Sequence, residues 1–197
     1  MSSEWEEATK WESDWHGNCA NSYQEESKQL DYANRMGLAV ERDLRNNPVI
    51  NFNHKRVIDV GGGPYSLLLK GINVMGTVVD PGLFPPWVKG RYASAGINFI
   101  SQKAEEYCSG YYDIGLLYNC LQHTEEPDKI VRNMRKMCGE IFVHEWLDTP
   151  KSNGHIQTIT EAQMNKWFDA RGTVGSERWN EHIVTQYYCG KFAGGLH

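Results

Sequence analysis

Residues 56–83 read RVIDVGGGPYSLLLKGINVMGTVVDPGL, and the rest of the chain is arranged around this stretch. The apolar run before the glycines is typical of a strand buried on both faces of a parallel sheet. Glycines 61–63 permit a tight turn with positive φ and leave no Cβ between backbone and ligand. Pro64 suits the first position of a short helix expected over 66–70, and a second apolar run ends at Asp80. This order predicts a nucleoside-binding half, in which the turn accepts the ligand and the acid binds two ribose hydroxyls.

Two side chains indicate which nucleoside this half binds. Ser66 stands where a dinucleotide-binding G-x-G-x-x-G turn has its third glycine. Asp59 lies inside the strand end, where a negative charge repels a pyrophosphate but suits a ligand with an ammonium and a sulfonium group. In this respect residues 59–64, DVGGGP, resemble the first motif of class I S-adenosylmethionine-dependent methyltransferases. The resemblance implies S-adenosylmethionine as the cofactor, held by Asp59, Gly61, Gly62, Gly63, Pro64, Asp80 and Pro81, with Asp80 as the ribose-binding acid.

Composition and charge narrow the class of protein. A chain of 197 residues suffices for one domain with a substantial core. A formal net charge of −5 and the lack of a long basic run disfavour nucleic acid as a partner. Five scattered cysteines, none paired as C-x-x-C, fit neither a zinc site nor a disulfide framework. Because no segment is apolar enough to span a membrane and the start is acidic, we expect a cytoplasmic protein without a membrane partner. The oligomeric state stays open.

Residues 1–48 are expected to form a helical lid ahead of a cofactor-binding domain at 49–197. The first helix has one apolar face, formed by Ala8, Trp11 and Trp15. A second helix, opened by a capping box at Ser22, is expected to run to about Leu44. Because this unit precedes the nucleoside half, we place it over the strand ends where ligands bind. The side chains expected to face the acceptor are Trp15, His16 and Tyr23.

Two later loops extend the resemblance. In the methyltransferase family, the loop after the third strand, expected here over 97–100, contacts the adenine. The matching residues are Gln102, Ala104 and Glu105. The fourth strand, 113–118, ends at NCLQHT, which resembles the family's N-x-L-x-H turn. There the backbone passes the methionine part of the cofactor, so the resemblance adds Asn119 and Leu121 to the cofactor site.

The C-terminal half completes the expected sheet. A helix over 127–137 precedes a fifth strand at 140–146. Residues 155–160, HIQTIT, are similar to a stretch found after the fifth strand in some methyltransferases that act on small molecules or sugars. Strands at 172–179 and 182–189 are expected to close the sheet as a hairpin. The expected fold is α/β and Rossmann-like: a doubly wound, mostly parallel seven-stranded sheet with an antiparallel C-terminal strand and N-terminal lid helices.

Three histidines are candidates for the chemistry. S-adenosylmethionine already carries an activated methyl group, so the protein must align the acceptor and exclude water. A hydroxyl acceptor gains from losing its proton during attack, and imidazole suits that task near neutral pH. We rank His123 first, His155 second and His144 third, with Glu145 expected to contact the acceptor. For each histidine the alternative is a hydrogen bond to backbone at the sheet edge, and a metal is not expected.

The main hypothesis is an S-adenosylmethionine-dependent methyltransferase that moves a methyl group to a small-molecule or sugar acceptor, at oxygen, by direct in-line displacement. The first alternative is a module that binds the cofactor without turnover. The glycine turn and its two acids indicate cofactor binding, but they do not indicate catalysis. The second is an NAD-dependent reductase, which Ser66 and Asp59 disfavour. The sequence does not identify the acceptor.

Overall fold

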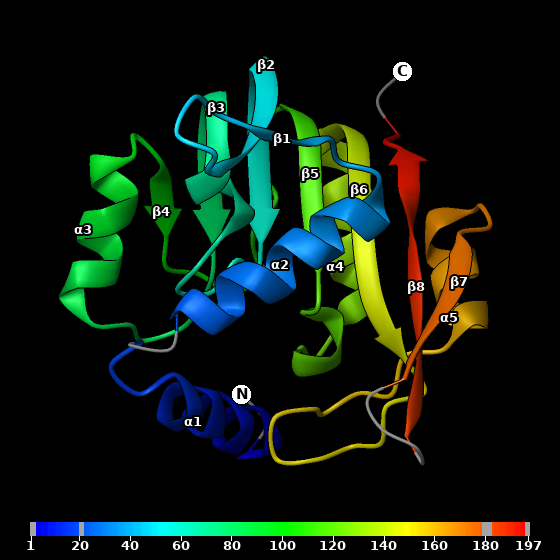
Figure 1. Ribbon diagram of the computed structural model, residues 1–197. Helices are drawn as coiled ribbons and strands as arrows, with labels where there is room; N and C mark the ends of the chain where they lie inside the picture. The colour runs from blue at the N-terminus through cyan, green and yellow to red at the C-terminus, as the bar shows by residue number, and fades with distance from the viewer. Residues whose placement is uncertain (1–2, 20–21, 179–182, 196–197) are drawn as a thin grey trace.

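A mixed eight-stranded sheet runs through the computed structural model, which describes residues 3–19, 22–178 and 183–195 (Figure 1). The strands are β1 Val40–Arg42, β2 Pro48–Val60, β3 Gly71–Val79, β4 Asn98–Ile100, β5 Tyr112–Tyr118, β6 Cys138–Leu147, β7 Thr173–Arg178 and β8 Val184–Ala193. Their order is β4-β3-β2-β5-β6-β8-β7, and β1 pairs with β2. The five strands from β4 to β6 are parallel, whereas β8 and β7 are antiparallel. The expected Rossmann-like fold is confirmed, and β1 is an additional strand.

Helices cover both faces of this sheet. They are α1 Ser3–His16, α2 Ser22–Met36, α3 Pro86–Ser94, α4 Pro127–Met137, α5 Glu161–Phe168, and the 3₁₀ helices η1 Leu67–Lys70 and η2 Leu121–His123. α2 and α3 share one buried core, and α4 and α5 share the other. α1 covers neither face, because it lies beyond the carboxyl ends of the parallel strands (Figure 1). In the described ranges, no helix combines the length and apolarity needed to cross a lipid bilayer.

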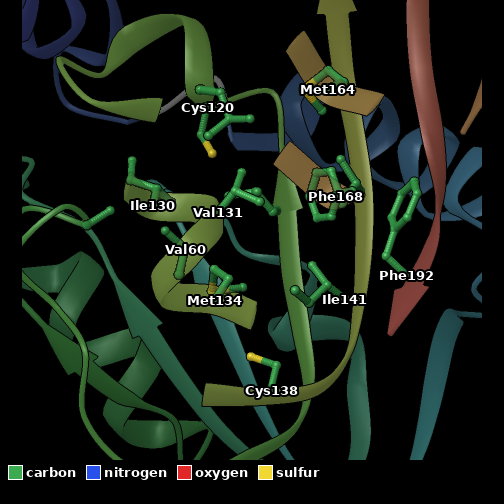
Figure 2. Close-up of a cluster of buried hydrophobic side chains, with 14 of the residues drawn as sticks. Val60, Cys120, Ile130, Val131, Met134, Cys138, Ile141, Met164, Phe168 and Phe192 are labelled. Atoms are coloured by element: carbon green, nitrogen blue, oxygen red, sulfur yellow. The ribbon is translucent and has the colours of Figure 1, made fainter. Parts of the chain in front are cut away.

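The alternation of side chains along β2 divides the core between the two faces. Val57 joins the cluster beneath α2 and α3, whereas Ile58 and Val60 join the cluster beneath α4 and α5. Figure 2 shows the second cluster, where helical side chains meet the sheet: Val131, Met134, Met164 and Phe168. Burial of each such side chain stabilises the fold by roughly 1.5–3 kcal/mol. The strand that leads into the glycine turn is therefore fixed on both faces.

The second N-terminal helix is shorter than expected. It ends at Met36 rather than near Leu44, which is fully exposed. Gly37 adopts φ +86°, and the N–H of Leu38 donates to the carbonyl of Ala33 at 2.9 Å, which terminates the helix with a left-handed glycine. The chain that follows turns back as β1 and adds a strand beside β2.

The segment after the glycine turn also differs from the prediction. Instead of a helix over 66–70 opened by Pro64, the structure has only the single 3₁₀ turn η1. Ser66 is its N-cap, and the Ser66 hydroxyl accepts the N–H of Leu68 at 3.0 Å. Pro64 therefore lies in the irregular turn, where it lines a cavity rather than starting a helix.

The C-terminal elements lie close to their expected positions, except that β8 extends to Ala193 instead of ending at Cys189. α4 spans 127–137 as predicted, and β6 includes the whole of the predicted fifth strand. β7 and β8 pair antiparallel, with Arg178 opposite Val184. The expected hairpin turn at Asn180 and Glu181 falls outside the described residues.

Candidate active site

A cavity of about 450 Å³ lies at the carboxyl ends of β2, β3 and β5. Its wall includes the turns after these strands, and α1 and α2 supply the opposite side. In Figure 1, α1 lies across the ends of the strands on this side of the sheet. Open α/β sheets bind ligands at this edge, and the volume suits a small molecule, for which sites of roughly 300–1,000 Å³ are usual.

The glycine turn lines this cavity, and a different physical constraint favours glycine at each of its three positions. Gly61 has φ +74°, and a Cβ there would lie 2.5 Å from the Cβ of Cys120. A Cβ on Gly62 would lie 2.9 Å from Oδ2 of Asp59. Gly63 has φ +60° and faces open space. The first two positions therefore have no room for a side chain, and the third presents bare backbone.

Asp80 links the glycine turn to the loop after β3. Its Oδ2 accepts the N–H of Gly63 at 2.9 Å, and its Oδ1 accepts the N–H of Gly82 at 2.7 Å. Burial raises the pKa of Asp80 to about 6, although both N–H groups lower it. The carboxyl group lies in the cavity wall beside Pro81. A ligand on the glycine turn would meet both residues.

Asp59 lies behind the glycine turn rather than in the cavity wall. Its Oδ2 accepts hydrogen bonds from the Ser66 hydroxyl and, at 2.6 Å, from the Tyr118 hydroxyl. Burial raises the pKa of Asp59 to about 7, against the effect of these two donors. The carboxyl group of Asp59 is therefore separated from the cavity by the backbone of the turn. Ser66, which stands in place of a third glycine, is one of the two donors that hold this carboxyl group.

The residues expected to meet an adenine divide into two groups. Ala104 and Glu105 line the cavity, whereas Gln102 does not. The side chain of Glu105 is engaged elsewhere, because its Oε1 accepts the N–H of Glu125 at 3.0 Å just before α4. At this position its negative charge also complements the positive end of the α4 dipole. Ala104 is therefore the residue of this loop that remains for contact with a ligand.

The side chain of Glu145, on β6, fixes the turn after β5 through hydrogen bonds to its backbone. Oε2 of Glu145 accepts the N–H groups of Cys120 at 3.1 Å and Leu121 at 2.8 Å. Burial raises the pKa of Glu145 to about 7, and these N–H groups oppose the rise. Neither Glu145 nor Leu121 lies in the cavity wall, which differs from their expected contacts with acceptor and cofactor. Asn119 does line the cavity, at a strand end where it adopts φ +49°.

His123 and His155 lie together in the cavity wall, with ring centroids 4.8 Å apart. Nδ1 of His123 is 2.9 Å from Oε1 of Glu12 and 2.7 Å from the carbonyl oxygen of Gly154. The amide nitrogen of Gln122 lies 3.4 Å from Nε2 of each histidine. Burial lowers the pKa of His123, but the Glu12 carboxylate outweighs it and the net pKa is raised. Burial and the neighbouring His123 lower the pKa of His155 to about 4, so His123 is the stronger base.

His144 lies outside the cavity, contrary to its expected place beside the acceptor. Its side chain is 0 % exposed and stacks between Tyr32, at 4.1 Å, and Tyr187, at 5.2 Å. Neither ring nitrogen has a hydrogen-bond partner among the described residues, and burial lowers the pKa of His144 to about 3. Neighbouring residues of a strand point to opposite faces, so His144 turns toward α2. It is a neutral core residue.

α1 supplies an aromatic part of the wall. Trp15 and His16, the two residues of α1 predicted to face the acceptor, line the cavity. Trp15 is 60 % exposed and stacks on Trp11 at 5.8 Å. Trp11 also packs closely on Gly154, where an added Cβ would lie 2.7 Å from the indole. The side chain of Tyr23 is outside the described residues.

Among the polar wall residues that sequence reasoning missed, Glu12 and Gln122 contact the histidines. A signal for Glu12 exists, because it lies four residues after the buried Ala8 and therefore on the same face of α1. Gln122 is next to His123, but nothing in its spacing distinguishes it from a surface residue. Among the residues that the structure describes, no three His, Cys, Asp or Glu side chains group together as metal ligands.

The chain matches no protein-family model, and no curated protein matches it. Solved structures nevertheless share its fold. Magnesium protoporphyrin IX methyltransferase from Synechocystis PCC 6803, with bound S-adenosylhomocysteine, aligns over 70 % of this chain and 73 % of its own, with a TM-score of 0.51 and 15 % identity. The N-methyltransferase NodS from Bradyrhizobium japonicum WM9, also with S-adenosylhomocysteine, aligns over 72 % and 78 %, with a TM-score of 0.52 and 14 % identity.

A third similar structure is coclaurine N-methyltransferase bound to N-methylheliamine and S-adenosylhomocysteine. It aligns over 78 % of this chain and 50 % of its own, with a TM-score of 0.52 and 14 % identity. The chain therefore has the fold of class I S-adenosylmethionine-dependent methyltransferases.

Proposed function

We propose that this chain is an S-adenosylmethionine-dependent methyltransferase that acts on a hydroxyl group of a small-molecule or sugar acceptor by direct in-line displacement. The observation that carries the proposal is the junction of Gly63 and Asp80, where bare backbone and a carboxyl group meet on one cavity wall. The position of this junction at the carboxyl ends of the strands supports the proposal, because open α/β sheets bind ligands at this edge.

The residues present fit the cofactor. The open space at Gly63 admits a ligand close to the backbone, and Asp80 offers carboxylate oxygens to two ribose hydroxyls. Ala104 is small enough to leave room for an adenine ring, and Asn119 lies where the methionine part would pass. When bound, S-adenosylmethionine supplies the activated methyl group.

The chain's own residues then align the acceptor and manage its proton. Nε2 of His123 is the ring nitrogen that does not contact Glu12. The Gln122 amide contacts this nitrogen at 3.4 Å, so an acceptor hydroxyl in the cavity would take the place of the amide. α1 serves as the lid in this proposal, and its Trp15 lines the cavity. Exclusion of water and fixed orientation reduce the barrier without a covalent enzyme intermediate.

Calorimetric titration with S-adenosylmethionine and with NADH tests the cofactor assignment. We expect S-adenosylmethionine to bind and NADH to bind much more weakly. Asp80→Ala should weaken S-adenosylmethionine binding by about tenfold or more, since each lost hydrogen bond to a charged group is worth roughly 1.5–3 kcal/mol. Tighter binding of NADH would reject the assignment in favour of a reductase.

Turnover separates the enzyme from a module that only binds the cofactor. S-adenosylhomocysteine formation is measured chromatographically with a panel of phenols, sugars and amines. We expect His123→Ala to lose roughly 10²-fold or more in rate while keeping its affinity for S-adenosylmethionine. Binding without product from any acceptor would favour the binding module, and an unchanged rate in His123→Ala would remove this histidine from the mechanism.

A further inference from the structure

One carboxylate of α1 reaches a ring nitrogen of the histidine that we assign as the base. Nδ1 of His123 has two acceptors, Oε1 of Glu12 at 2.9 Å and the carbonyl oxygen of Gly154 at 2.7 Å. A carbonyl oxygen only accepts, so Nδ1 carries the hydrogen. In the neutral ring, the lone pair then belongs to Nε2, the tautomer that a base facing the cavity needs.

The Glu12 carboxylate stabilises the protonated form of His123. The ionisable side chains that act on the ring or share its surroundings come from α1, α2, the end of β3, β6 and the loop after β6: Glu12, His16, Glu25, Lys28, Asp80, Glu145 and His155. Burial opposes the imidazolium, but the hydrogen bond and charge of Glu12 raise the pKa of His123 beyond that effect. Burial likewise opposes ionisation of Glu12, and His123 outweighs it, so the pKa of Glu12 is lowered.

The position of Glu12 depends on how α1 is seated. Near the start of the helix, the Lys103 ammonium lies 3.5 Å from the ring centroid of Trp5. One turn before the end, Trp11 packs on Gly154, the residue whose carbonyl also holds His123. Trp11 and Glu12 therefore contact two residues, Gly154 and His123, that are themselves joined by a hydrogen bond. Glu12 meets His123 when α1 lies over the cavity.

We propose that Glu12 is a positioning residue, and that α1 completes the base when it covers the cavity. This inference rests on the proposed function. As the acceptor oxygen bonds to the methyl carbon, the carbon–sulfur bond breaks and its electron pair stays on sulfur, giving neutral S-adenosylhomocysteine. The hydroxyl proton passes to Nε2 of His123, and the Glu12 carboxylate stabilises the resulting imidazolium. The proton leaves to solvent after the product departs.

Nitrogen-15 NMR of histidine-labelled protein with S-adenosylhomocysteine measures the tautomer and pKa of His123 directly. The signal is assigned by its loss in His123→Ala. In Glu12→Gln we expect a lower pKa and a mixture of tautomers. Glu7→Gln, the same substitution at an exposed position of α1 outside the cavity wall, is the control and should match the parent protein.

Methylation of catechol, as a probe acceptor, gives the second readout. We expect Glu12→Gln to reduce the rate roughly tenfold, to move the acid limb of the pH–rate profile to lower pH, and to keep S-adenosylmethionine affinity. An unchanged tautomer and pKa in Glu12→Gln would overturn the proposal, as would a measurable catechol profile with an unmoved acid limb. The proposed function would be rejected by a different result, namely that the parent protein does not bind S-adenosylmethionine. If the parent protein does not methylate catechol, the NMR measurement alone decides the role of Glu12.

Discussion

Replacement of Asp59 by Asn is expected to remove a pH-dependent cost to folding. The carboxyl group is fully buried, and both of its hydrogen bonds reach Oδ2. Within residues 3–19, 22–178 and 183–195, Oδ1 has no hydrogen-bond partner. Burial raises its pKa from 3.8 to about 7. Between these values, the folded carboxyl group keeps a proton that the unfolded one releases. The stability from Asp59 is therefore complete below pH 3.8 and is lost as the pH rises through about 7.

The size of this loss follows from the shift in pKa. A shift from 3.8 to about 7 is about 3 units, and each unit corresponds to about 1.36 kcal/mol, which gives about 4 kcal/mol. An amide cannot ionise, and its oxygen can still accept from Ser66 and Tyr118. Asp59→Asn should therefore gain stability relative to the parent protein as the pH rises, whatever its stability in acid.

Urea unfolding between about pH 4 and about pH 8 measures the effect. The difference in unfolding free energy between Asp59→Asn and the parent protein should rise by about 4 kcal/mol over this range. Other groups titrate in both proteins, so their contributions cancel in the difference. Asp14→Asn, at an exposed position of α1, is the matched control. Parallel curves for Asp59→Asn and the parent protein would refute the reasoning, because Asp59 would then have the same pKa in the folded and unfolded states.

Two further predictions concern buried ionisable groups. Affinity for S-adenosylmethionine should fall as the pH drops below about 6, where Asp80 takes up a proton and loses acceptor capacity; calorimetry at several pH values should show this fall in the parent protein and a flatter dependence in Asp80→Asn. His144 has a folded pKa near 3 against an ordinary 6.5, so its contribution to stability is present above 6.5 and is lost as the pH falls toward about 3. His144→Phe should remove that loss in urea unfolding and keep the aromatic stack, whereas an unchanged acid sensitivity would show that His144 is protonated in the folded protein.

Much of the fold follows from local signals in the sequence. Pro127 marks the first residue of α4, because proline lacks only a hydrogen bond that this position does not make. The apolar run before Gly61 is a strand in the middle of the sheet. The end of α2 at Met36 was harder to predict, since the apolar pattern continues to Leu44 and a single Gly37 terminates the helix. Here backbone conformation prevails over side-chain periodicity.

The site was less predictable because it depends on contacts between distant segments. Asp59 and Asp80 both end parallel strands, yet only Asp80 lies in the cavity wall. The two carboxyl groups differ because the hydroxyl groups of Ser66 and Tyr118 donate hydrogen bonds to Asp59. The spacing of these residues in the sequence predicts neither contact. The same limit applies to Glu12, whose partner lies more than a hundred residues later in the chain.

Three buried carboxyl groups lie at strand ends in or behind the cavity wall: Asp80 lines the cavity, and Asp59 and Glu145 lie behind it. Asp59, Asp80 and Glu145 each have a pKa that burial raises, to about 7, about 6 and about 7. In the described part of the chain, none of them forms an ion pair with Lys or Arg. Their ionised forms are therefore costly until a positive charge arrives nearby. A cofactor with a sulfonium and an ammonium group supplies that charge, whereas a diphosphate adds to the repulsion. The same acids that hold the turns in shape thus favour a cationic ligand in the cavity.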